Sequence, residues 1–176
     1  MKPTSYLLLF ISTFASAAFA AEEPLSIAIA VPIHDGKRTI GSDNEHKSHF
    51  PVIITNTSKK PVRFWQEWCS WGYNALTFEL IDEHGNKRIA RQGGTQIWRR
   101  NFPDFWTLRP NDSLVVDIYF SDTKIWDGFP VKIDSDSHTY TMRVLCDVKP
   151  DLDSKELKVW TGHIASASFK YDFFGL

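Results

Sequence analysis

The chain has 176 residues, of which 43% are hydrophobic and 14% aromatic, and its 20 Lys and Arg nearly balance its 21 Asp and Glu. This length fits one ordinary domain with a single core. A formal net charge of −1 argues against a general nucleic-acid-binding protein, which needs an excess of positive charge to pair with phosphates.

The first twenty residues predict an export signal. Lys2 is followed by an apolar run from Tyr6 to Phe14 and by Ala18-Phe19-Ala20, an ending typical of a signal-peptidase site. We expect cleavage after Ala20, a periplasmic or secreted location, and a single domain over residues 21–176. The apolar run is shorter than a membrane span, and no later run reaches the length of about 18 residues that a span requires. The sequence therefore predicts no membrane-spanning segment.

Apolar residues at every second position predict strands through the rest of the chain. These positions are Leu25, Ile27, Ile29 and Val31; Phe50, Val52 and Ile54; Leu76, Phe78 and Leu80; Leu114, Val116, Ile118 and Phe120; and Tyr140, Met142, Val144 and Cys146. Between them, Asp82 to Lys87 is typical of a hairpin in which Gly85 and Asn86 supply positive φ angles. No helical period is sustained, so we expect at most single helical turns near residues 95–100 and 154–157. The pattern predicts an all-β protein, an antiparallel β-sandwich of one domain.

Four strand-and-turn segments also carry a resemblance to a known family. They read FPVIITNTSKKPV at residues 50–62, LTFELIDEHGNK at 76–87, LRPNDSL at 108–114 and YTMRV at 140–144. In this order they resemble the immunoglobulin-like domains of the BsuPI-type proteinase-inhibitor family, over roughly residues 50 to 148. The resemblance implies an immunoglobulin-like or fibronectin-like sandwich. The aromatic block at residues 64–73 and the segment Ile97 to Trp106 depart from the family pattern.

Two cysteines, Cys69 and Cys146, are the only ones in the chain. In the oxidising compartment to which the leader points, two cysteines favour one disulfide, and we predict a Cys69–Cys146 bond. The alternative is two buried, unpaired cysteines. With the bond, the block from Phe64 to Tyr73 would be the stapled centre of the sandwich, with Trp68 or Trp71 packed against the sulfurs.

The tryptophans and the neighbouring arginines supply the candidate binding residues. Seven tryptophans are many for one core of this size, and exposed rings are common in protein interfaces and sugar-binding sites. An arginine beside a tryptophan also permits cation–π contacts. The predicted binding residues are Trp65, Trp98, Arg99, Arg100 and Trp106. The alternatives are that most of these rings are buried and that the arginines form a solvated strand face.

Metal and catalytic signals are weak. His46 and His49 form an H-x-x-H pair without a third histidine nearby, and the segment from Asp134 to His138 lacks the glycine and ligand spacing of a calcium loop. No nucleophile elbow, phosphate-binding glycine loop or zinc-protease motif occurs. We therefore predict no metal, no cofactor and no enzymatic activity.

The function expected from these features is an exported module that binds another envelope or secreted protein, such as an inhibitor or immunity-type factor in the bacterial envelope. Loops at one end of a sandwich and the Trp98 to Trp106 segment would form the binding surface. The first alternative is recognition of a cell-wall or extracellular glycan through Trp65, Trp98 or Trp106. The second is a structural envelope accessory domain in which all aromatic side chains are buried.

Overall fold

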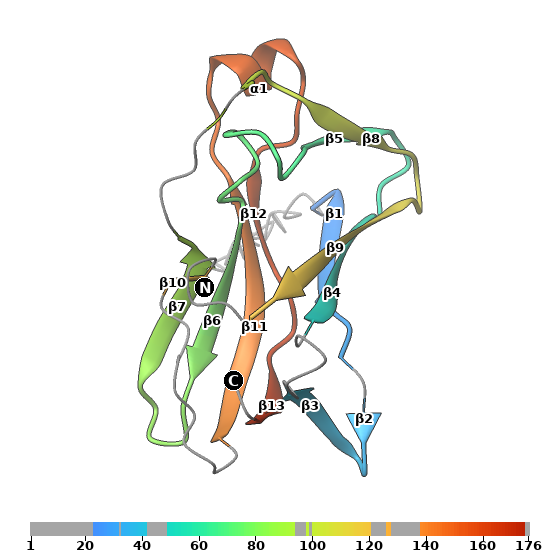
Figure 1. The fold of residues 1–176 in the computed structure, drawn as a ribbon. Coiled ribbons are helices and arrows are strands. Elements are labelled where there is room, and N and C mark those ends of the chain that lie inside the picture. The colour runs from blue at the N-terminus through green and yellow to red at the C-terminus, as the bar shows by residue number, and fades with distance from the viewer. Residues whose placement is uncertain are drawn as a thin grey trace, which may run out of the picture.

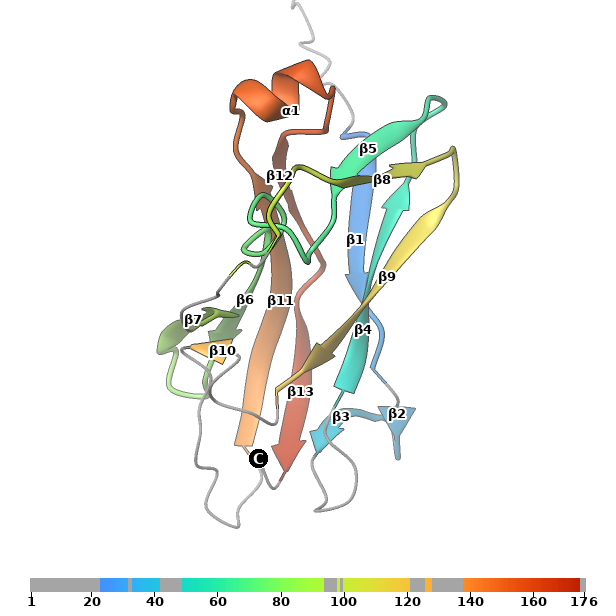
Figure 2. The same cartoon turned by 45° about the horizontal axis from the view of Figure 1, so that its top comes forward.

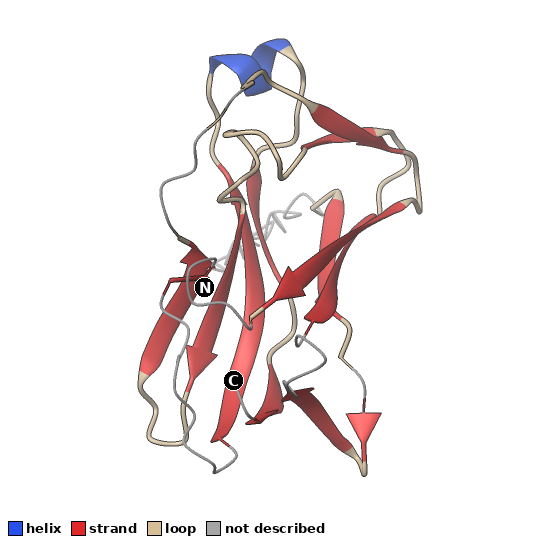
Figure 3. Ribbon diagram, in the orientation of Figure 1, coloured by secondary structure: helices blue, strands red, loops and turns tan. Residues whose placement is uncertain are grey.

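The computed structural model describes residues 23–31, 33–41, 49–93, 98, 100–120, 126–127 and 138–174. This part of the chain consists of strands and one short helix, which confirms the all-β prediction (Figure 3). The strands form two larger sheets that face each other and a two-stranded sheet near one end (Figure 1). The predicted signal segment lies outside the described residues. No described helix is long and apolar enough to cross a membrane.

The first sheet has three antiparallel strands in the order β1-β4-β9. Their bounds are Leu25–Ile29 for β1, His49–Asn56 for β4 and Ser113–Tyr119 for β9. The central strand β4 places Phe50, Val52 and Ile54 on the inner face, where each side chain is at most 1% exposed. The apolar residues that alternate along β4 thus lie on one buried face of the strand, as the sequence predicts.

The second sheet has the order β10-β7-β6-β11-β13-β3-β2, with β12 also paired to β11. The bounds are Ile33–His34 for β2, Lys37–Gly41 for β3, Leu76–Ile81 for β6, Lys87–Gln92 for β7, Trp126–Asp127 for β10, His138–Val148 for β11, Gly162–Ala165 for β12 and Phe169–Phe174 for β13. Pairing is antiparallel except between β13 and β3, which run parallel. The predicted hairpin joins β6 to β7, with Gly85 at φ 83°.

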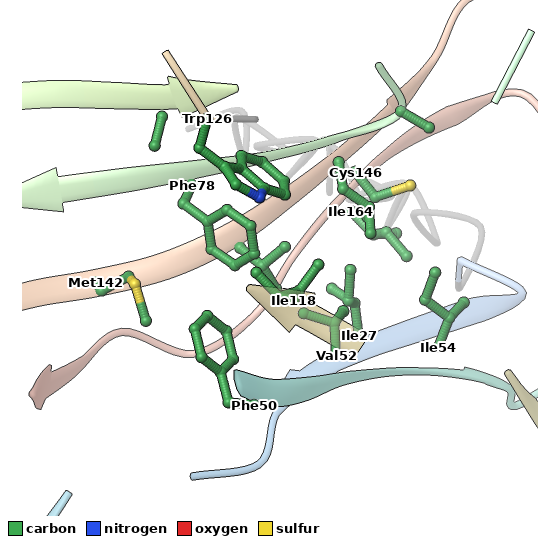
Figure 4. Packing of buried hydrophobic residues seen from close by; sticks show 14 of the residues in the cluster. Ile27, Phe50, Val52, Ile54, Phe78, Ile118, Trp126, Met142, Cys146 and Ile164 are labelled. Carbon is green, nitrogen blue, oxygen red and sulfur yellow. The ribbon is translucent and has the colours of Figure 1, made fainter. Parts of the chain in front are cut away.

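The core fills the space between the two larger sheets. Phe50 of β4 contacts Phe78 of β6 edge-to-face with ring centroids 5.7 Å apart, and Phe78 contacts Trp126 of β10 at 5.2 Å. Figure 4 shows these rings pointing toward one another from both sheets, with Met142 beside them. Each such aromatic pair contributes about 1 kcal/mol beyond the burial of its area. The contact between Phe50 and Phe78 therefore joins the two sheets, and Trp126 extends the aromatic cluster within the second sheet.

A small sheet and a helix lie together at one end of the molecule (Figure 2). The small sheet pairs β5, Val62–Trp65, with β8, Phe105–Leu108. The helix α1, Leu152–Glu156, begins with a capping box, because Asp151 accepts a hydrogen bond from Ser154 N (2.6 Å) and Ser154 Oγ accepts one from Asp151 N (2.9 Å). The prediction of a helical turn near residues 154–157 is confirmed, and the helix begins two residues before the predicted start.

Asn56, at the end of β4, is fully buried and joins three segments of this end. Its Nδ2 donates to Lys60 O at 2.8 Å and to Leu108 O at 2.9 Å, while its Oδ1 accepts from Ser58 N at 2.9 Å and from Ser58 Oγ at 2.8 Å. All donors and acceptors of the amide are satisfied. The side chain thus fastens β4 to the end of β8 and to the turn before β5.

The two cysteines are free and buried, so the predicted Cys69–Cys146 disulfide is not formed. Cys69 Sγ turns toward its own loop and donates to Gln66 O at 3.1 Å. Cys146 packs in the core beside Ile164 (Figure 4), where burial, together with the negative charge of Asp147, raises the pKa of its thiol to about 12. Each sulfur therefore has a protein environment of its own, and the alternative of two unpaired cysteines describes the structure.

Glu79 of β6 is a carboxylate that is only 6% exposed. Lys87 forms an ion pair with its Oε2, and Arg143 Nε lies 2.9 Å from its Oε1. The hydrogen bond from Lys87 is the largest influence and, with help from Arg143, outweighs the opposing effect of burial, so the pKa of Glu79 is lowered below the 4.5 of a free glutamate. The charged form of Glu79 is therefore favoured in the folded protein.

We expect Glu79→Gln to lower the free energy of unfolding by about 2 kcal/mol at pH 7, since charge-assisted hydrogen bonds are lost. Because the folded-state pKa is lowered, this contribution is present above pH 4.5 and is lost as the pH falls through the folded-state value. Urea titrations at pH 7, 5 and 3 should show the difference from the wild type shrinking with pH. The control is Glu83→Gln, in the exposed β6–β7 turn, and an equal difference at pH 7 and pH 3 would contradict the prediction.

Candidate functional site

The segment between β5 and β6 folds into a series of tight turns. Cys69 O accepts hydrogen bonds from Gly72 N at 3.1 Å and from Tyr73 N at 3.0 Å, and Gly72 O accepts one from Ala75 N at 3.0 Å. Gly72 allows this path because a Cβ at its position would lie 2.2 Å from the backbone oxygen of Gln66. The glycine is therefore required for the close approach of two backbone segments.

A second segment, which leads into β8, is hydrogen-bonded to these turns. Gln66 N donates to Asp104 O at 3.0 Å. Asn101 and Ser70 form a reciprocal pair, in which Ser70 N donates to Asn101 Oδ1 at 3.0 Å and Asn101 Nδ2 donates to Ser70 Oγ at 2.8 Å. Three hydrogen bonds thus hold together two loops that lie more than thirty residues apart in the sequence.

These loops present Trp68 and Phe102 to solvent, and we call the two residues the aromatic pair. Their ring centroids are 5.1 Å apart with an interplanar angle of 74°, an edge-to-face contact. Trp68 is 39% exposed and Phe102 is 51% exposed. The indole Nε1 of Trp68 donates to Gln66 Oε1 at 2.6 Å, which fixes the ring on its own loop. The aromatic pair is therefore a solvent-facing apolar feature whose geometry is set before any partner binds.

The predicted binding residues fall into different environments. Trp65 lies in the core at 2% exposure and is excluded from any surface. Trp98 is half-buried, with its ring perpendicular to that of Tyr73 at 5.5 Å. Trp106 of β8 is 43% exposed, Arg100 is exposed beside Asn101, and Arg99 lies outside the described residues.

The sequence reasoning did not select the aromatic pair. The sequence predicts Trp68 or Trp71 to pack against a disulfide, and Phe102 is not among the predicted binding residues of its segment. Trp68 lies in a turn and Phe102 in an irregular segment, so neither has the alternating neighbours that reveal which face of a strand is buried. The Ser70–Asn101 hydrogen bonds that bring the two rings together link residues 31 positions apart and leave no mark in the sequence.

Metal-binding side chains do not gather in the described part of the chain. Within them, no group of three His, Cys, Asp or Glu side chains comes close enough to hold a metal ion. The side chains of the two candidate metal-binding segments, residues 46–49 and 134–138, lie outside the described part of the chain. What the described part of the chain offers at this site is a pair of exposed aromatic rings on two loops that are hydrogen-bonded to each other.

Comparison with known proteins adds no assignment. No family model matches the sequence, and no curated protein is significantly similar to it. The geometry of the chain is therefore the basis for a functional proposal.

Proposed function

We propose that the chain is an exported, immunoglobulin-like β-sandwich that binds another protein of the bacterial envelope or extracellular space. The contact surface is the aromatic pair, Trp68 and Phe102, together with the exposed Arg100 two residues before Phe102. An inhibitor or immunity-type factor is the specific form of this function. The protein needs no cofactor and catalyses no reaction in this role.

The observation that carries the proposal is the exposure of two large rings on loops that are already hydrogen-bonded to each other. Tryptophan and arginine are the side chains most enriched at the energetic centres of protein interfaces. A loop that is ordered before binding also avoids an entropic cost of about 0.5–1.5 kcal/mol for each immobilised side chain. An apolar pair held in place at a loop end is thus suited to protein recognition.

A glycan-binding function is the second candidate, and the exposure of Trp106 on β8 favours it. A sugar ring stacks on a flat aromatic face, yet the aromatic pair presents two rings at 74° to each other. Trp65 is buried, and the Trp98 ring is perpendicular to that of Tyr73, so neither adds a flat platform. A purely structural role, with every aromatic side chain buried, does not account for the exposure of Trp68, Phe102 and Trp106.

We expect Trp68→Ala combined with Phe102→Ala to weaken capture of the partner at least tenfold, because both rings would be buried in the complex. The measurement is cross-linked capture from an envelope extract of the organism that makes the protein, followed by titration of the captured species. The same variant should keep its melting temperature within about 3 °C, since exposed side chains contribute little to folding.

The matched control is Leu152→Ala, which removes another exposed apolar side chain from α1, where Leu152 is 83% exposed. Capture that falls equally in the control and in the double variant would show that the aromatic pair has no special role. If a cell-wall polysaccharide instead binds and quenches tryptophan fluorescence in the wild type but not in Trp106→Ala, that result would favour the glycan-binding function.

A further inference from the structure

Strand β9 lies at the edge of its sheet, and among the described strands only β4 pairs with it. It pairs with β4 on one side and ends the order β1-β4-β9. An edge strand exposes a row of backbone donors and acceptors that can pair with another chain. Natural proteins normally cover, shorten or charge such an edge. In β9 the only charged side chain is that of Asp117.

The hydrogen bonds around β4 show which β9 groups point outward. Ala30 N donates to Pro51 O on the β1 side, and Asn56 N donates to Asp112 O on the β9 side, both at 3.0 Å. Hydrogen-bonded pairs alternate along an antiparallel ladder, so even-numbered residues of β4 bond to β9. The register then assigns Leu114, Val116 and Ile118 to the β4 ladder. The backbone groups of Val115 and Asp117 therefore point to the open side.

The inner face of the same strand is incompletely covered. Leu114 and Val116 pack against the core but are only half-buried, whereas Val52 and Ile54, their partners on β4, are 0% exposed. The difference arises because β4 has a neighbour on both sides and β9 has one. A further strand beside β9 would complete the burial of these two side chains.

A groove runs along this open edge. It has a volume of about 370 Å³, and five consecutive residues of β9, 115–119, line one side of it. The opposite side comes from the second sheet and the β5–β6 loop, through Leu76, Trp126 and Glu67. The walls combine apolar side chains, such as those of Leu76, Val116 and Ile118, with polar ones, and the charged residues among them are Glu67 and Asp117, both acidic. The groove therefore favours an extended, apolar segment that carries positive charge.

We propose that an extended peptide segment of the partner protein adds to the sheet beside β9. Its backbone bonds to Val115 and Asp117, alternate apolar side chains face Leu76 and Trp126, and at least one Lys or Arg lies near Asp117 or Glu67. This proposal rests on the proposed protein-binding function and adds the conformation and charge of the bound segment. Main-chain pairing with pockets for alternate side chains is a general mode of peptide recognition.

Charge argues for a partner segment over a second copy of this chain. The sequence of β9, Ser-Leu-Val-Val-Asp-Ile-Tyr, contains no basic residue. Antiparallel pairing of two copies would bring two Asp117 side chains into the same region without a cation to balance them or Glu67. Like charges opposite each other weaken strand pairing.

The test uses a phage-displayed library of random nine-residue peptides, selected on the immobilised full-length mature protein. We expect the enriched peptides to alternate apolar residues and to carry Lys or Arg. For a synthetic peptide of the enriched sequence, Val115→Pro should reduce the affinity at least tenfold. Proline at that position removes an outward N–H while the ladder to β4 stays intact. Asp117→Asn should reduce the affinity severalfold and weaken its dependence on salt.

Thr107→Pro is the matched control, because it places proline on another exposed edge strand, β8, where the register leaves the Thr107 N–H outside the β5 ladder. It should leave peptide affinity unchanged. Hydrogen exchange on the wild type is a readout that needs no variant: the peptide should protect the amides of Val115 and Asp117. Protection elsewhere, or equal affinity in Val115→Pro, overturns the proposal.

Two further outcomes also decide the question. A concentration-dependent dimer that Val115→Pro abolishes would assign the edge to a second copy and overturn the peptide proposal. If no peptide is enriched while capture from the envelope extract still depends on Trp68, edge pairing fails and the proposed function stands. If peptides bind at β9 while capture is unaffected by the aromatic-pair variant, edge pairing stands and the role of the aromatic pair fails.

Discussion

Replacing Asn56 by alanine is expected to lower the free energy of unfolding by about 3 kcal/mol, because the four hydrogen bonds of its amide are lost and each contributes about 0.5–1.5 kcal/mol. The substitution removes both donors of the Asn56 amide, and with them the bonds to Leu108 O and Lys60 O. The turn at Ser58 loses its acceptor as well. Both connections from β4 to the small sheet are thereby weakened.

Urea denaturation followed by tryptophan fluorescence measures this loss. The control is Thr55→Ala, one residue earlier on β4, where the hydroxyl forms only an exposed hydrogen bond with Ser113 Oγ at 2.8 Å. That change should cost less than about 1 kcal/mol, as surface substitutions usually do. A loss below 1 kcal/mol for Asn56→Ala would show that water replaces the amide and that Leu108 O is accessible to it.

Gly72→Ala is expected to lower the free energy of unfolding by a similar amount, for a different reason. The new Cβ would lie 2.2 Å from Gln66 O and 2.7 Å from its carbonyl carbon, and both are backbone atoms that cannot rotate away. Forcing atoms into an occupied space costs about 1–3 kcal/mol, and more where the backbone must move. A loss of about 3 kcal/mol would lower the melting temperature by about 10 °C in a domain of this size.

A thermal melt of Gly72→Ala beside Gly85→Ala separates contact from backbone strain. Gly85 has a positive φ of 83° but nothing within 4 Å of an added Cβ, so alanine there is strained without a clash and should cost about 1 kcal/mol. If the two variants melt at the same temperature, the close approach of Gly72 to Gln66 is not a constraint on the β5–β6 loop.

Much of the fold followed from residue patterning. The alternating runs at Phe50 to Ile54, Leu76 to Leu80 and Tyr140 to Cys146 all form strands with one buried face. Burial with period two leaves this imprint on the sequence wherever a strand covers a core. No sequence pattern reveals the parallel pairing of β13 with β3, because the choice of a strand partner more than a hundred residues away depends on the whole fold.

The predicted Trp98 to Trp106 segment contributes Arg100 and Phe102 to the proposed surface, whereas Trp68 comes from the aromatic block. Arg100 and Trp106 are exposed as expected, but Trp65 is buried by its place on β5, next to the second sheet. Neighbouring tryptophans in one block look equivalent in sequence, and long-range pairing decides which ring is covered. The prediction of a disulfide was wrong for a related reason. Cysteine count and compartment give a tendency to pair, whereas the orientation of each Cβ comes only from the fold.

The position of β11 has a consequence for how the chain reaches its folded state. This strand pairs with β6, β12 and β13, so it joins the two halves of the larger sheet, yet it begins only at residue 138. In a polypeptide that grows from its N-terminus, β6 can pair only with its hairpin partner β7 until β11 begins, when nearly four-fifths of the chain has been made. Local structure cannot substitute, because isolated hairpins are marginally stable in water. Completion of the larger sheet is thus coupled to completion of synthesis.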